Sequence, residues 1–84
     1  MPVSSLQDAA ADYATAHRRH QAATVKAKAA SARYSLERTG DAREAMGDAW
    51  RVCDRAMRDL WVARDVLCET AVHSGQMAMF GDAA

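Results

Sequence analysis

The residues with the clearest capacity for chemistry are two neighbouring histidines. His17 and His20 stand three positions apart, a spacing at which two side chains on one helix can share a metal ion. No carboxylate occupies a complementary position on that face, and the Glu-x-x-His pattern of helical metal sites is absent. We therefore interpret His20 as a packed, hydrogen-bonded histidine and expect neither a metal nor a cofactor.

The two cysteines are the next candidates for chemistry. Cys53 and Cys68 are expected on one helix about four turns apart, which is far beyond the reach of a disulfide bond. Buried or half-buried thiols are the expected state, and an intermolecular bridge across a dimer is the alternative.

Other catalytic patterns are missing from the sequence. It contains no Ser/His/Asp order, no glycine loop that would cradle a phosphate and no pair of carboxylates in an evident cleft. The formal net charge is zero, and no apolar run approaches the roughly 20 residues that span a bilayer. The first residues, Met-Pro-Val-Ser-Ser, do not resemble a signal peptide. We expect a cytoplasmic protein that is not an enzyme and has no small-molecule substrate.

Two long helices are expected to carry whatever site exists. Alanine-rich sequence without glycine or proline predicts a first helix over about residues 4–38, and Ser4-x-x-Gln7 resembles a capping box at its start. The second helix is predicted over about 42–73, with Ser74-Gly75 as its stop signal.

The turn between the helices is predicted at residues 39–41. Gly40 is expected to take the left-handed conformation that ends the first helix, and Asp41 to cap the second together with Glu44. Gly47 lies inside the second helix and indicates either close backbone approach or slight fraying.

The apolar periodicity predicts how the two helices pair. Each helix carries a stripe with alternating three- and four-residue spacing, and facing positions have an almost constant sum, as they do in an antiparallel hairpin. The seam formed by these stripes consists of Ala9, Tyr13, Ala16, His20, Ala23, Ala27, Ala30 and Tyr34 against Thr70, Leu67, Ala63, Leu60, Ala56, Cys53, Ala49 and Met46. The predicted fold class is therefore all-α: a long antiparallel two-helix hairpin, or alanine-rich coiled coil.

The second helix holds more large apolar groups than the seam can use. Its additional stripe consists of Trp50, Met57, Trp61 and Cys68. Such a row of exposed apolar groups favours a covering partner. That partner is either a second copy of the chain, giving a four-helix bundle, or another protein docked on the stripe.

The first helix carries a basic flank. We expect Arg18, Arg19, Lys26 and Arg33 to project away from the seam. The simpler interpretation is a solvated face partly paired with Asp54, Asp59 and Asp65, and the alternative is contact with nucleic acid. No helix-turn-helix or aromatic-interleaved basic motif supports the alternative.

The segment 76–84 differs in composition from the rest of the chain. It follows a helix stop and is expected to be an extended arm, although it contains two methionines and a phenylalanine. Gln76-Met77-Ala78-Met79-Phe80 resembles the pentapeptide by which many bacterial proteins bind the sliding clamp of DNA polymerase III.

The resemblance to clamp-binding proteins assigns a role to four of the five residues. It implies that Gln76 makes hydrogen bonds, that Met79 and Phe80 enter the hydrophobic pocket of the clamp, and that Met77 makes a lesser apolar contact. Ala78 departs from the commoner serine or aspartate at a tolerant position. The alternative is that this segment folds back over the open end of the hairpin near Leu6 and Tyr13.

Three functions of different class follow. The leading hypothesis is a small adaptor or inhibitor that docks in the clamp pocket and blocks or redirects replication, a design that would suit a phage-encoded host-takeover protein. The second is a homodimeric structural bundle without clamp binding. The third is a nucleic-acid-binding hairpin that uses the basic flank.

Overall fold

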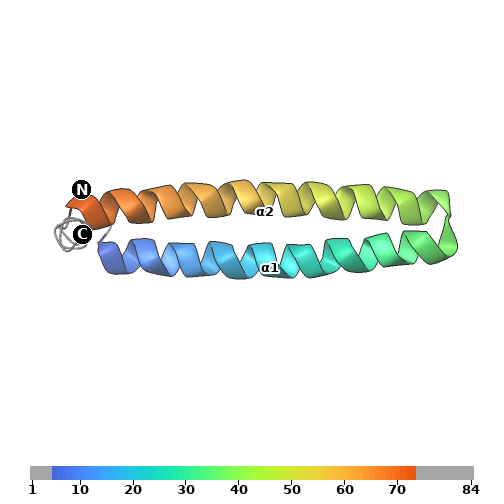
Figure 1. Cartoon of the computed structure of the whole chain (residues 1–84), viewed down its shortest axis with the longest axis horizontal. Coiled ribbons are helices and arrows are strands. Elements are labelled where there is room, and N and C mark those ends of the chain that lie inside the picture. The colour runs from blue at the N-terminus through green and yellow to red at the C-terminus, as the bar shows by residue number, and fades with distance from the viewer. Residues whose placement is uncertain (1–4, 74–84) are drawn as a thin grey trace, which may run out of the picture.

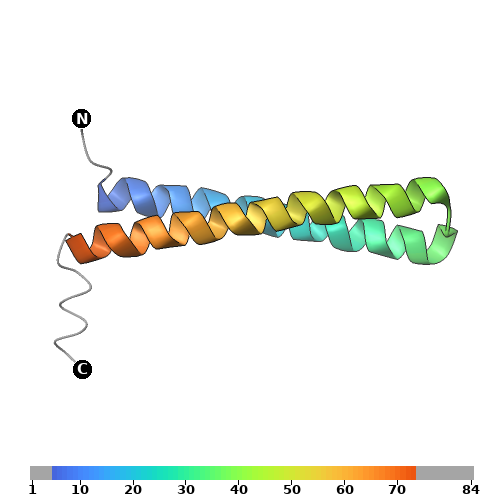
Figure 2. The same ribbon diagram turned by 90° about the horizontal axis from the view of Figure 1, so that it is seen from above.

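The protein is an all-α antiparallel helical hairpin. The structure, a computed structural model, describes residues 5–73 and contains α1 (Leu6–Glu37) and α2 (Gly40–His73). The two helices lie side by side along their whole length, so both ends of the described chain meet opposite the turn (Figure 1). They cross at a shallow angle in the perpendicular view, as coiled-coil helices do (Figure 2). The predicted stop at Ser74-Gly75 and the predicted arm over 76–84 lie outside the described residues.

The start of α1 differs from the prediction. Ser5, rather than Ser4, is the N-cap, and its side-chain oxygen accepts a hydrogen bond of 3.0 Å from the backbone N–H of Asp8. Gln7 therefore stands one position too early to complete a capping box. Asp8 contributes a negative charge to the first turn, where the helix dipole favours it.

The turn consists of Arg38 and Thr39 rather than of residues 39–41 as predicted. Arg38 holds the left-handed conformation, with φ 53° and ψ 30°, and its N–H donates to the carbonyl of Tyr34 at 2.9 Å. Thr39 then caps α2, because its Oγ1 accepts from the N–H of Ala42 at 3.0 Å. Gly40 is already the first residue of α2, and Asp41 lies in its first turn. The assignments of the left-handed position to Gly40 and of the cap to Asp41 with Glu44 were therefore wrong.

The predicted seam is confirmed by burial. Every position of both stripes is buried or half-buried, although the chain is otherwise mostly exposed. The central cluster consists of Ala23, Ala27 and Cys53, with Ala49 and Ala56 packed against it. Nearly all the buried residues of 5–73 are alanines, so the two backbones approach closely and the helices meet over small side chains.

Gly47 has no role in close backbone approach. A Cβ built there would meet only the guanidinium of Arg51, at 3.7 Å, which is ordinary contact with a flexible group. The predicted backbone approach at this position was wrong.

The alanine seam predicts that added volume at its centre destabilises the hairpin. Ala27 is fully buried, so Ala27→Leu should force the helices apart and lower the free energy of unfolding by about 1–3 kcal/mol. Urea denaturation followed by circular dichroism measures this change. Ala29→Leu is the matched control, because Ala29 is exposed on the same helix and should change stability by less than about 0.5 kcal/mol. Equal effects of the two changes would contradict the seam.

The turn geometry predicts opposite requirements at positions 38 and 40. Arg38→Gly should raise the free energy of unfolding by up to about 1 kcal/mol, because glycine adopts the left-handed conformation without a Cβ clash. Gly40→Ala should be neutral or stabilising by about 0.4–1 kcal/mol, because a Cβ there meets nothing within 4 Å. Thermal denaturation of both variants checks this, and a loss of stability in Gly40→Ala would show that Gly40 holds the left-handed position after all.

Candidate functional site

The surfaces available for function are the two flanks of the seam, because α2 carries large apolar residues on both. We call the stripe of Trp50, Met57, Trp61 and Cys68 the tryptophan flank. The groove flank lies on the other side of the seam and includes Val52, Val62 and Val66.

The tryptophan flank is half open to solvent and partly held by α1. Trp50 is 39% exposed and Trp61 is 52% exposed, while Met57 is half-buried. The indole Nε1–H of Trp50 donates a hydrogen bond of 2.9 Å to Oγ of Ser31, which holds this ring against α1. A rigid aromatic group with its polar atom satisfied is well suited to anchor a partner.

The two cysteines differ in their surroundings. Cys53 is buried in the seam with its Sγ 3.4 Å from Oγ1 of Thr24, whereas Cys68 is exposed on the tryptophan flank. Both are free thiols, as the separation along α2 predicted for a bond within one chain. The expectation that both are at least half-buried was wrong for Cys68, which lies outside the seam.

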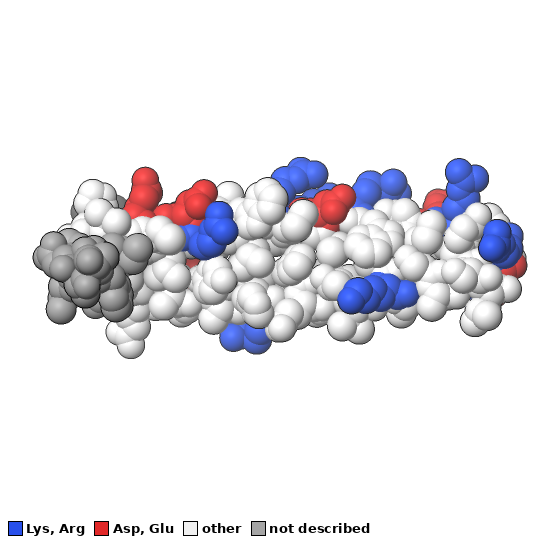
Figure 3. Space-filling view, viewed as in Figure 1, with Lys and Arg blue, Asp and Glu red and all other residues white. Residues whose placement is uncertain are grey.

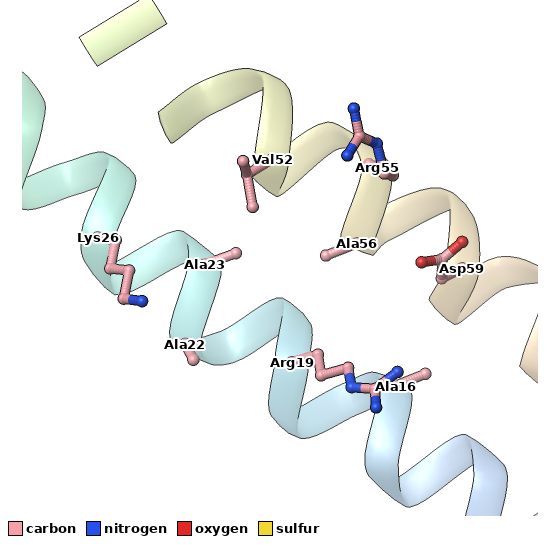
Figure 4. A pocket seen from close by; sticks show the side chains of 9 residues that line it. All are labelled: Ala16, Arg19, Ala22, Ala23, Lys26, Val52, Arg55, Ala56 and Asp59. Carbon is pink, nitrogen blue, oxygen red and sulfur yellow. The ribbon is translucent and has the colours of Figure 1, made fainter. Parts of the chain in front are cut away.

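The groove flank contains two hollows that share Asp59. The larger, of about 350 Å³, is floored by small apolar groups, and Ala23 and Ala56 point toward each other between the helices there (Figure 4). Arg19 and Lys26 border it from α1, and Arg55 borders it from α2. The second hollow, of about 280 Å³, is lined by Asp12, Asp59, Val62, Ala63 and Val66. Together the hollows form one shallow groove along the rod.

The four basic residues predicted to share a flank have different surroundings. Arg19 and Lys26 line the larger hollow. Arg33 instead pairs with Glu37 at 3.0 Å, and Arg18 donates to Oγ1 of Thr15 at 3.3 Å.

The predicted pairing of the basic flank with acids of α2 does not form. Within residues 5–73, Asp65 is 3.9 Å from Arg64 of its own helix, and neither Asp54 nor Asp59 has an ion pair. The ion pairs among the described residues instead join neighbours on the same helix.

The histidines do not come together with other metal ligands. His17 is exposed beside Tyr13, with ring centroids 6.2 Å apart, and His20 is half-buried in the seam. His20 is half-buried as predicted, but among residues 5–73 its imidazole makes no hydrogen bond, so that part of the prediction was wrong. Its backbone carbonyl accepts a hydrogen bond of 2.8 Å from Oγ1 of Thr24. No group of three metal-ligating side chains exists among residues 5–73.

The groove was missed by sequence reasoning. Its signal was present as Val52, Asp59 and Val66, which repeat every seven residues beside the seam. The repeat indicated a second face of α2, but only the register with α1 reveals which residues face it.

Charged groups are spread unevenly over one broad face of the hairpin. Figure 3 shows much of this face uncharged, with most acidic and basic side chains along the α2 edge and further basic side chains on the α1 half. Neither α1 nor α2 is long and apolar enough to cross a membrane. The predicted clamp-binding residues Gln76, Met77, Met79 and Phe80 lie outside the described part of the chain.

The fold and its two flanks define a helical hairpin with surfaces for helix packing. Comparisons with protein families, curated protein sequences and solved structures found no match for this chain. The assignment of function therefore depends on the hairpin's own residues.

The hydrogen bond to Ser31 predicts that the two tryptophans differ in solvent access. Trp50→Phe leaves Trp61 as the fluorophore, and Trp61→Phe leaves the less exposed Trp50. Acrylamide should quench the first variant more strongly than the second. Weak and equal quenching in the free protein would instead mean that the tryptophan flank is already covered.

Proposed function

We propose that this protein is a small protein-binding adaptor or inhibitor that docks its clamp-like pentapeptide in the pocket of the bacterial sliding clamp. In this role it would block or redirect replication by occupying a site that polymerases also use. The observation that carries the protein-binding class is the tryptophan flank, where two half-exposed indoles lie on a helix whose seam is already filled.

The resemblance of the pentapeptide to clamp-binding motifs supports this choice of partner. The pentapeptide begins at Gln76, three residues after His73, where α2 ends. His73 is exposed at the end of the rod opposite the turn. A segment that leaves this end can reach a pocket on another protein without displacing the seam. Met77, Met79 and Phe80 would supply the apolar contacts, and Gln76 the polar one.

The tryptophan flank would provide a second contact. Trp50 and Trp61 are larger than any side chain buried in the seam, and aromatic anchors of this kind dominate the free energy of many protein interfaces. Two linked contacts strengthen binding because the second becomes intramolecular once the first has formed.

Nucleic-acid binding is not proposed as a second function. Only Arg19 and Lys26 of the predicted basic set line one hollow, while Arg33 is paired with Glu37. A steep fall of DNA affinity with added salt is the behaviour that this alternative predicts.

Clamp binding predicts a specific loss on changing the pentapeptide. The double variant Gln76→Ala, Phe80→Ala should weaken binding to purified clamp by about 30-fold or more, because an interface anchor commonly contributes about 2 kcal/mol. Isothermal titration calorimetry measures the affinity, and circular dichroism should show unchanged helicity.

Two further variants separate the pentapeptide from the hairpin. Trp61→Ala should weaken clamp binding by a smaller factor if the tryptophan flank makes the second contact. Lys28→Ala is the control, since Lys28 is exposed and belongs to neither the pentapeptide nor the tryptophan flank. Undiminished clamp binding by the Gln76→Ala, Phe80→Ala variant would falsify the proposed function.

A further inference from the structure

The groove flank carries an arrangement of charge that the seam does not explain. Its basic residues Arg19, Lys26 and Arg55 border the hollow nearer the turn, whereas Asp12 lies in the hollow nearer the open end. Asp59 belongs to both hollows and marks the middle of the groove. The groove is thus basic toward one end and acidic toward the other.

The charged side chains of the groove have no partners among the described residues of the hairpin. Among residues 5–73, none of Asp12, Arg19, Lys26, Arg55 and Asp59 has a hydrogen bond or an ion pair through its side chain. All are exposed, and Val52, Val62 and Val66 expose apolar surface between them. An apolar groove with unpaired charges along its rim fits an amphipathic helical surface of complementary charge.

We propose that the occupant of this groove is a second copy of the chain, packed groove to groove with its turn at the opposite end. A twofold interface joins the same patch on both copies, so that patch must be complementary to itself after rotation. A groove that is basic at one end and acidic at the other meets this condition when the copies are antiparallel.

The register of the hairpin defines the contacts. Val52 and Val66 lie equally far from Asp59 along α2, and Lys26 and Asp12 lie equally far from Arg19 along α1. A twofold axis across the rod at Arg19 and Asp59 therefore places Lys26 over Asp12 of the second copy and Val52 over Val66 of the second copy. Arg19 and Asp59 of both copies then meet around the axis, in a cluster of two positive and two negative charges.

The alternative twofold axis, along the rod, is disfavoured by charge. It would pair Arg19 with Asp59 of the second copy, but it would also place the basic end of one groove over the basic end of the other, with Lys26 near Arg55 of the second copy. Like charges brought together at an interface oppose association.

The resulting dimer is a four-helix bundle that leaves the tryptophan flank free. The sequence pattern alone favoured the tryptophan flank as the dimer face, but the self-complementary charge belongs to the groove. The ends of the two α2 helices at His73 then point in opposite directions. This dimer does not depend on clamp binding, and it is tested without the clamp.

Charge exchange tests the dimer. Sedimentation equilibrium should find the wild type dimeric at micromolar concentration, and Asp12→Lys or Lys26→Asp should each raise the dimer dissociation constant by about tenfold, because two attractive pairs become repulsive. The double variant Asp12→Lys, Lys26→Asp should recover the wild-type value. Lys28→Asp is the matched control, since the same charge change outside the groove should have no such effect.

Thiol cross-linking tests the orientation. In a Cys68→Ala background, Val52→Cys combined with Val66→Cys should form a disulfide-linked dimer on mild oxidation. The two introduced thiols are roughly 21 Å apart within one α2, so they can form a disulfide only between copies. Either change alone should cross-link poorly. A wild type that stays monomeric at tens of micromolar would overturn the proposal and leave the groove for a helix of another protein. A dimer whose dissociation constant is unchanged by both charge reversals would also overturn it.

Discussion

The close approach of two helices over alanine is the constraint on which the rest of the structure depends. Ala23, Ala27 and Ala56 hold the two backbones close at the centre of the seam, and Met57 and the tryptophans of α2 lie beside the seam rather than within it. The narrow seam therefore produces the exposed apolar flanks. A wider seam with leucine at these positions would bury more surface and leave less of it for binding.

The same constraint explains why a chain of zero net charge has an uneven distribution of charge on its surface. Because no Asp, Glu, Lys or Arg lies in the seam, these charged residues occupy the outer faces and the margins of the groove. The balance of whole-chain charge then conceals a local separation, with Lys26 and Arg55 near one hollow and Asp12 near the next. Net charge is a poor guide to recognition in a rod of this shape, since exposed charges act over only about 10 Å.

The fold was predictable from sequence to the level of facing residues, and the helix ends were not. The seam follows from periodicity and from one antiparallel register, which many residues determine together. The caps depend on which hydroxyl reaches a free N–H, and Ser5 and Thr39 do so where Ser4 and Asp41 were expected. A glycine at position 40 suggested the left-handed residue, yet Arg38 holds that conformation because the two helices are joined by only two residues.

The sequence by itself determined that the chain forms two helices, where they turn, and which residues meet between them. These properties follow from spacing along one chain, where each helix repeats every 3.6 residues regardless of its neighbour. Only the tertiary structure decided that Arg19 and Lys26 of α1 share a groove with residues of α2, among them Asp59. It also decided that the indole N–H of Trp50 donates a hydrogen bond to Ser31. Such groupings combine side chains from both helices, and they exist only once the alanine seam has fixed how close the helices stand and how they are rotated.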